Sequence, residues 1–148
     1  MSESATLLSE QQLITAAKAP TVAYNEKNWD AVKASISTGF EYDEVATQRK
    51  AQGADAVLTL WKGWATAFPD SKASFDHVYA IGDQVVLELT WRGTHQGPLT
   101  TPKGTIAPTG KRIEFRSCVI CELAGDKAKL QRQYFDMGTM LQQIGATG

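Results

Sequence analysis

The sequence has few residues that bind metals or form disulfides: its 148 residues include two cysteines and two histidines. No second Cys or His pair exists to complete a structural zinc site. The first ten residues lack the basic start and apolar stretch of a secretion signal, and no apolar run reaches the length of a membrane span. Opposite charges nearly cancel to a net charge of −1, which gives no reason to expect nucleic acid or an anionic membrane as partner. We therefore expect a cytoplasmic protein without metal or other cofactor.

The two cysteines, Cys118 and Cys121, lie in the segment RIEFRSCVICEL, whose pattern is typical of a strand. Because side chains alternate between the faces of a strand, an odd separation puts the two thiols on opposite faces. From there they can neither bridge each other nor share a metal. We predict two reduced, buried cysteines without a redox function.

The residues that are present suit one globular domain, which we assign to residues 1–148. An apolar share of 43% and a charged share of 21% are ordinary for such a protein, and the length allows one substantial core. Apolar residues recur at helical spacing in the first half of the chain, where Pro20 is expected to kink or interrupt the first helix. These helical segments are 7–25, 25–37 and 53–70, with a short strand at 39–47 between the last two.

After Pro69 the pattern changes to that of strands. A hairpin is predicted over 73–97, turning at Gly82-Asp83. Two further strands and a short C-terminal helix follow at 111–123, 128–135 and 137–145. Residues 96–110 are rich in Gly, Pro and Thr and must form a long connection, and loops of that length are often functional lids.

Helices followed by a run of antiparallel strands predict an α+β fold with helices on one face of a sheet. A sheet that curls around its helices encloses a concave pocket, which small-molecule sites favour. The strand at 111–123 is apolar or amphipathic on both faces, although a sheet covered on one side needs only one such face. We therefore expect a homodimer that pairs through the outer face of the sheet.

Four segments, WATAFPD, GDQVVLELTWRGTHQG, PTGKRIEF and YFDMGTMLQQIG, resemble the SnoaL-like polyketide cyclases and their ester-cyclase relatives. That family belongs to the nuclear-transport-factor-like cone folds. The resemblance covers most of the chain from about residue 55 onward. It implies a conical barrel, in which a curved antiparallel sheet wraps around N-terminal helices and leaves an apolar cavity.

The resemblance also implies a catalytic residue. Characterised cyclases use an aspartate just before the C-terminal helix as general acid/base in an aldol closure, and Asp136 corresponds to it. The cyclases pair this aspartate with a histidine on a neighbouring strand, but strand 111–123 contains none. Related epoxide hydrolases carry Arg-x-Asp where this chain has Arg92-Gly93-Thr94. The resemblance therefore predicts the fold and leaves the reaction open.

Two interpretations of Asp136 follow from the residues themselves. Alternation along the last strand puts Arg132, Tyr134 and Asp136 on one face, opposite Gln133 and Phe135. As a polar strip in an apolar cavity, they would include a desolvated carboxylate whose pKa is raised toward neutrality for acid/base work. Asp is also a preferred N-cap, and capping the last helix explains the residue equally well.

The other candidates also have two interpretations each. His95 is either a second proton carrier at the mouth of the cone or a strand-end histidine bonded to backbone. Tyr42 either donates to a substrate oxygen or packs its ring and keeps its hydroxyl at the surface. Aromatic stripes at helical spacing are usually core, so the remaining aromatic candidates are expected to be core and cavity wall. With Arg132 and Tyr42, the expected substrate-binding residues are Trp61, Trp64, Phe68 and Trp91.

We predict a small-molecule enzyme of the SnoaL-like type. Asp136, assisted by Tyr134 and His95, would act as acid and base on a small apolar carbonyl compound, giving aldol-type cyclisation or isomerisation. The alternatives are a non-catalytic binder of a small apolar ligand and an epoxide-hydrolase-like hydrolase.

Overall fold

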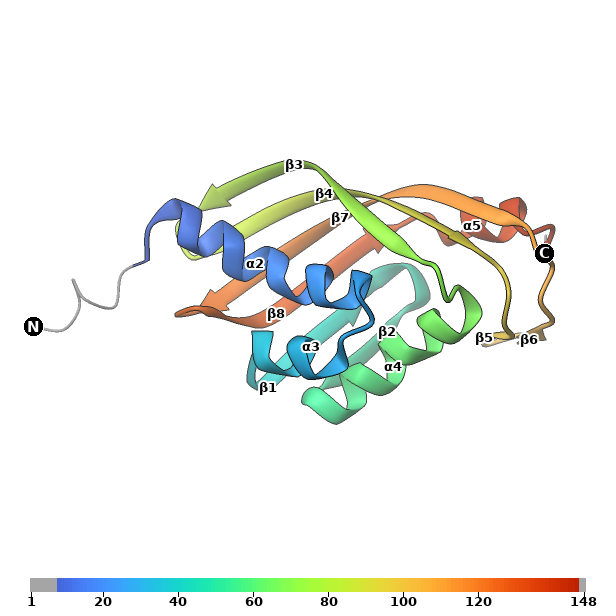
Figure 1. The fold of residues 1–148 in the computed structure, drawn as a ribbon, viewed down its shortest axis with the longest axis horizontal. Coiled ribbons are helices and arrows are strands. Elements are labelled where there is room, and N and C mark those ends of the chain that lie inside the picture. The colour runs from blue at the N-terminus through green and yellow to red at the C-terminus, as the bar shows by residue number, and fades with distance from the viewer. Residues whose placement is uncertain (1–7, 147–148) are drawn as a thin grey trace, which may run out of the picture.

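A computed structural model describes residues 8–146 and shows four helices and eight strands in that part of the chain (Figure 1). The helices are α2 (Glu10–Asn25), α3 (Trp29–Ser35), α4 (Ala54–Ala67) and α5 (Met137–Gln143), and a short 3₁₀ turn is η1 (Val45–Thr47). The strands are β1 (Ile36–Glu44), β2 (Arg49–Gln52), β3 (Lys72–Ile81), β4 (Gln84–Thr94), β5 (Leu99–Thr101), β6 (Gly104–Ile106), β7 (Arg112–Ala124) and β8 (Lys127–Phe135).

In the described part of the chain, six strands form one curved sheet in the order β2-β1-β8-β7-β4-β3. Helices α2, α3 and α4 lie along its concave side, and the sheet stays open between its two edges (Figure 1). The predicted α+β cone is thereby confirmed. One detail differs from the expectation, because β1 and β8 pair in parallel whereas the other neighbours are antiparallel. These two strands are far apart in the chain, so no tight turn constrains their relative direction.

The helices begin at side-chain or glycine caps. Ser9 and Gln12 form a capping box at the start of α2, and the Asn28 side chain caps α3. Helix α2 runs through the buried Pro20 as a single helix, so interruption there, one of the two predicted outcomes, does not occur. Its buried face packs against the sheet, and such tertiary packing can outweigh the cost of one missing backbone donor. Helix α4 begins after Gly53, which has φ +86°, and Asp55 lies in its first turn.

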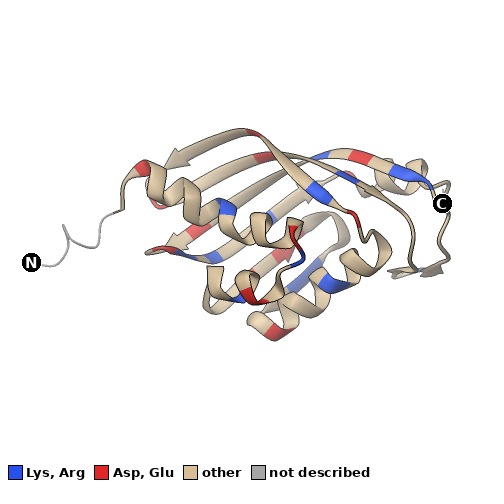
Figure 2. Cartoon of the chain, in the orientation of Figure 1, with Lys and Arg blue, Asp and Glu red and all other residues tan. Residues whose placement is uncertain are grey.

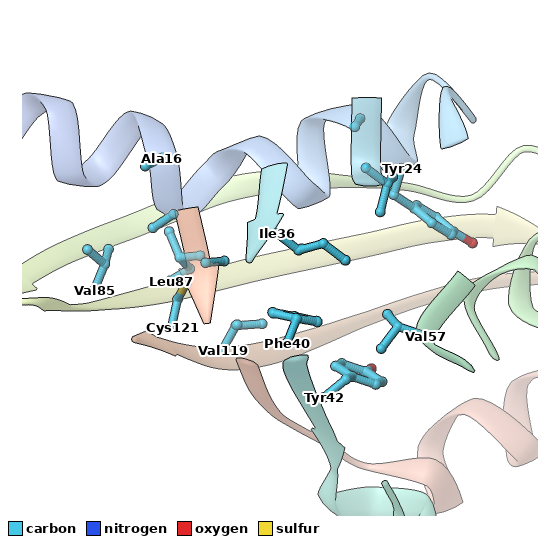
Figure 3. Close-up of a cluster of buried hydrophobic side chains, with 14 of the residues drawn as sticks. Ala16, Tyr24, Ile36, Phe40, Tyr42, Val57, Val85, Leu87, Val119 and Cys121 are labelled. Carbon is cyan, nitrogen blue, oxygen red and sulfur yellow. The ribbon is translucent and has the colours of Figure 1, made fainter. Parts of the chain in front are cut away.

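The core lies between the helices and the concave face of the sheet. In Figure 3, Ala16 and Tyr24 of α2 lie opposite side chains of the sheet that include Leu87, Val119 and Cys121. Cys121 is buried and Cys118 lies on the other face, which confirms that the two free thiols face opposite ways. Cys118 is only partly buried, so the prediction that both cysteines are buried is wrong for this residue. A second buried cluster closes the opposite end of the fold and contains Ala67, Phe68, Leu99, Ile113, Met140 and Ile144.

The segment 96–110 is attached to the end of α4. The backbone N–H groups of Gln96 and Gly97 both donate to the carbonyl of Ala67, at 3.0 and 3.1 Å. Leu99 inserts into the second buried cluster, and β5 and β6 form a small hairpin outside the main sheet. The expected long connection is therefore anchored at its base.

Charged residues of both signs are interspersed over the helices and strands (Figure 2). This distribution agrees with the net charge of −1 and offers no extended patch of one sign on the elements seen in that view. Within residues 8–146, none of the helices combines the length and apolar character needed to cross a membrane.

Candidate functional site

A cavity opens between helices α2 and α4 and the concave face of the sheet. Its empty space is about 690 Å³ when the open solvent at its mouth is included. Within residues 8–146, 16 residues line it, and eight of these are aromatic. The lining consists of Thr21, Tyr24, Tyr42, Glu44, Trp61, Trp64, Phe68, Ser71, Trp91, Ile113, Phe115, Val119, Gln131, Gln133, Phe135 and Met140.

The aromatic side chains of the wall hold one another edge to face. Trp61 meets Tyr24 and Tyr42 with ring centroids 6.3 and 5.4 Å apart and interplanar angles of 89° and 88°. Tyr24 also meets Trp91 at 5.4 Å and 83°. Edge-to-face packing is favoured by the ring quadrupoles and fixes each ring against its neighbours. The cavity therefore has a rigid apolar wall before any ligand enters.

One carboxylate, that of Glu44, reaches this wall with no exposed side-chain area. Its Oε1 accepts from Thr47 Oγ1 at 2.6 Å and from Arg49 Nη2 and Nε at 2.7 and 3.2 Å. Its Oε2 accepts from the Tyr42 hydroxyl and from Trp64 Nε1, both at 2.8 Å. A buried charge is tolerated only when it is paired and hydrogen-bonded, and these contacts meet that need.

A chain of hydrogen bonds continues from this carboxylate across the cavity. The indole N–H of Trp91 donates to Gln133 Oε1 at 3.1 Å, and Gln133 Nε2 donates to the Tyr42 hydroxyl at 2.7 Å. Because an indole nitrogen only donates, it fixes which end of the Gln133 amide faces Trp91. Burial, and next the negative charge of Glu44, raise the pKa of Tyr42 well above its ordinary value. Tyr42 therefore keeps its proton, and its hydroxyl donates a hydrogen bond to Glu44.

A second glutamine of β8 lies beside this network with an unused donor. Gln131 is 3% exposed and lines the cavity. Among residues 8–146, its Nε2 has no hydrogen-bond partner. Buried amide groups without a partner are rare and costly, so this one needs an explanation.

Five of the predicted substrate-binding residues lie in the cavity lining. Tyr42 is there with its hydroxyl inside the network described above, and not at the surface. The other four are the expected aromatic wall residues, namely Trp61, Trp64, Phe68 and Trp91.

The predicted orientation of the last strand is wrong. Gln131, Gln133 and Phe135 face the cavity, whereas Tyr134 is 42% exposed and Arg132 lies 3.7 Å from Asp43 in an ion pair outside the described lining. The cause is a bulge: Glu122 of β7 pairs with Leu130, but the next residue, Leu123, pairs with Ala128. One extra residue in β8 reverses which side chains point inward beyond it.

Asp136 is also outside the cavity lining that residues 8–146 provide. It is exposed and caps α5, accepting from the Thr139 backbone N–H at 3.3 Å and from Thr139 Oγ1 at 2.9 Å. These bonds, first the one from the hydroxyl and then the one from the backbone, lower the pKa of Asp136. The expected desolvated carboxylate with a raised pKa is therefore wrong, and the capping interpretation describes the geometry.

His95 is buried behind the cavity and is not part of its described lining. Its ring packs against Phe68 with centroids 5.3 Å apart, and Nδ1 accepts from the Thr109 backbone N–H at 3.2 Å and lies 3.0 Å from Thr109 Oγ1. Burial lowers the pKa of His95, against an opposing contribution from the Gly97 backbone. The residue joins β4 to the segment 96–110, which agrees with the structural interpretation.

Sequence reasoning missed Glu44, Gln131 and Gln133 in the cavity lining, and also Thr21 and Ser71. A signal for Glu44 exists, because alternation through FEYDE puts it on the same face as Phe40 and Tyr42. The two glutamines would have followed from placing Phe135 in the cavity. Among residues 8–146, no group of three His, Cys, Asp or Glu side chains gathers in a way that could hold a metal ion.

Comparisons with known proteins agree with this geometry. A family model described as SnoaL-like polyketide cyclase matches residues 14–144. No protein of curated function matches the sequence significantly.

Solved structures with the same fold have low sequence identity to this chain. A proposed SnoaL-like polyketide cyclase from Jannaschia sp. CCS1 superimposes with a TM-score of 0.82 at 17% identity, covering 94% of this chain and 95% of its own. IdmH, a proposed polyketide cyclase from Streptomyces antibioticus, gives 0.78 at 20%, covering 90% and 99%. An LEH-like epoxide hydrolase from M. tuberculosis gives 0.69 at 21%, covering 90% of each chain. At such identities the similarity establishes the fold alone.

Proposed function

Because this chain belongs to the SnoaL-like polyketide cyclase family, we propose that it binds a small, planar, largely apolar compound in the cone cavity. The observation that carries the proposal is the wall itself, in which eight of the 16 lining residues that the structure describes are aromatic. Apolar burial stabilises a complex by roughly 25 cal/mol per Å² removed from water. A preformed wall adds selectivity for flat ligands, because its rings need not rearrange.

The polar network supports binding without a chemical step. Every oxygen of Glu44 already accepts hydrogen bonds, and Tyr42 both donates and accepts within the network. The hydrogen bonds of Glu44 and Tyr42 are complete before a ligand arrives. Covering these groups with the apolar surface of a ligand therefore leaves no polar group unpaired and adds no cost in free energy of that kind.

The proposal is tested by calorimetric titration with 9-fluorenone, a flat tricyclic ketone. Val119 lines the cavity and Ile120 is its neighbour on the opposite face of β7. Val119→Phe should fill the cavity and abolish binding, whereas Ile120→Phe should bind like the wild type, with circular dichroism confirming that both are folded. Equal binding by wild type and Val119→Phe would contradict the proposal, as would no binding by the wild type.

A second function is favoured by one observation, the buried carboxylate of Glu44 on the cavity wall. In a bound ketone, Glu44 Oε2 could take the proton from the carbon next to the carbonyl, leaving the electron pair as an enolate. This step begins both aldol cyclisation and isomerisation. It requires a donor such as Tyr42 to move away from Oε2, which is why we place binding first.

Deuterium exchange tests this second function directly. The C2 protons of 1-indanone in D₂O should exchange faster with wild-type protein, followed by proton NMR, and Glu44→Gln should remove the acceleration. Glu41→Gln, on the same strand but exposed, is the matched control. Exchange that is no faster than in buffer would contradict this second function, and only the binding function would remain.

A further inference from the structure

The unpaired amide Nε2 of Gln131 indicates which polar group a ligand of the cavity carries. Its side chain is 3% exposed in the cavity lining, and within residues 8–146 its Nε2 donates to nothing. Hydrogen-bond donors are left unpaired in a buried position only at a cost in free energy. An acceptor atom brought by a ligand would remove that cost, so the amide is prepared for an occupant.

A second amide on the same face of β8 belongs to Gln133, two residues along the strand, which also lines the cavity. The Gln133 amide is oriented by Trp91, which donates to its oxygen, and by Tyr42, which takes one of its two hydrogens. The other hydrogen has no assigned acceptor in the network of the described residues. Side chains two apart on a strand lie on one face roughly 6–7 Å apart, so both amides border the same volume.

The charge of the cavity restricts which acceptor fits. Glu44 places a negative charge on the wall with no exposed side-chain area, and the Arg49 that pairs with it lies 2.7 Å away. A ligand carboxylate would bring a second negative charge into an apolar space beside the first, which is strongly unfavourable. A neutral oxygen avoids that repulsion and still accepts a hydrogen bond.

We propose that Gln131, with the free hydrogen of Gln133, receives a neutral acceptor oxygen of the ligand, such as a ring ketone. The protein thereby selects flat apolar carbonyl compounds over matched hydrocarbons, donors and acids. This inference rests on the proposed binding function and adds the substrate class to it. It makes Gln131 a specificity-determining residue.

Four flat tricyclic probes separate the possibilities. Fluorene has no polar group, 9-fluorenone adds a carbonyl acceptor, carbazole carries only an N–H donor, and fluorene-9-carboxylate is an anion. Affinities are measured by titration for the wild type, for Gln131→Met and for Gln52→Met, an exposed strand glutamine that controls for the chemical change. A side-chain amide NMR spectrum follows the Gln131 signals during the fluorenone titration.

The wild type should bind fluorenone about 3- to 10-fold more tightly than fluorene, as one net neutral hydrogen bond predicts. Gln131→Met should remove that preference and leave fluorene binding unchanged, while Gln52→Met keeps the preference. Carbazole and the carboxylate should bind no better than fluorene. Equal binding of fluorene and fluorenone by the wild type, or a preference for carbazole or the carboxylate, overturns the inference and leaves the proposed binding function standing. Failure of all four probes to bind contradicts the binding function itself.

Discussion

The hydroxyl of Tyr42 donates to Glu44 Oε2 at 2.8 Å, and both residues lie on β1 with their side chains toward the cavity. This bond links the charged end of the wall, where Arg49 neutralises the carboxylate, to the neutral end formed by Gln133 and Trp91. Glu44, Tyr42, Gln133 and Trp91 thus form one connected network, and removing its acceptor Glu44 should affect all four residues.

Glu44→Ala should lower the free energy of unfolding by about 2–4 kcal/mol, because Tyr42 and Trp64 lose their acceptor and Arg49 its partner. Glu44→Gln keeps the shape and one acceptor oxygen, so its loss should be smaller. Glu41→Ala, exposed on the same strand, should change stability by no more than about 0.5 kcal/mol. Urea unfolding of the three variants measures these losses of unfolding free energy. A Glu44→Ala variant that is as stable as Glu41→Ala would show that the network contributes nothing to stability.

Asp136 should behave as a helix cap. Asp136→Asn should keep most of the thermal stability and all of the ligand binding, because Asn caps about as well as Asp, whereas Asp136→Ala should lower the thermal midpoint. A loss of fluorenone binding in Asp136→Asn would contradict the capping role and show that Asp136 takes part in ligand binding despite its exposed position.

The pH dependence of the Asp136 contribution has a definite sign. Its pKa is lowered in the folded protein by the bonds from Thr139. The stability it adds is therefore present above the pKa of the unfolded chain and is lost as the pH falls through the lowered folded value. The difference in thermal midpoint between wild type and Asp136→Ala should shrink on acidification, and a difference independent of pH would contradict this assignment.

His95 should make stability depend on pH in a different window. Burial lowers its pKa in the folded protein, so the unfolded chain binds the proton first as the pH falls. Stability should therefore decrease as the pH drops below the unfolded value of about 6.5, until the folded value is reached. His95→Gln should flatten this slope between pH 7 and pH 5 in urea titrations. An unchanged slope in His95→Gln would be evidence against the buried neutral ring.

Two glycines near α4 should respond oppositely to alanine. A Cβ on Gly97 would lie 1.9 Å from the Thr66 carbonyl oxygen, so Gly97→Ala must push the segment 96–110 away from the helix. We expect a loss of about 1–3 kcal/mol. Gly63, exposed within α4, has open space around its Cβ position, so Gly63→Ala should gain roughly 0.5–1 kcal/mol. Thermal unfolding of both variants decides, and a tolerated Gly97→Ala would mean that the segment is not held at this point.

The sequence allowed much of this fold to be predicted because its signals are local. Helical spacing located α4, and the turn at Gly82-Asp83 located the hairpin of β3 and β4. The part of the aromatic wall formed by Trp61, Trp64 and Phe68 followed from the same spacing, since large apolar side chains on the buried face of a helix also line any cavity beside it. The homodimer expected from the two-faced strand 111–123 stays a prediction.

The polar half of the site could not be predicted, because its geometry depends on contacts between distant segments. The alternation in β8 defines two faces, but neither face is uniformly apolar, and the bulge between Ala128 and Leu130 is visible only in its pairing with β7. A buried Glu44 carboxylate is stable only with partners such as Arg49 and Trp64, which come from other parts of the chain. Arg49 belongs to β2, whose four residues have no sequence pattern typical of a strand. The family resemblance gave Asp136 a catalytic role, but its position at the start of α5 is explained by helix capping.

The central claim, that the aromatic cavity is the ligand site, is tested most directly by the indole N–H signals of the four tryptophans in a nitrogen–proton NMR spectrum. Trp61, Trp64 and Trp91 line the cavity, whereas Trp29 lies outside its described lining and meets Tyr24 at 5.8 Å. Titration with 9-fluorenone should shift the three lining signals along one saturable curve and leave Trp29 nearly unmoved. Four unchanged signals, or a shift confined to Trp29, would contradict the account.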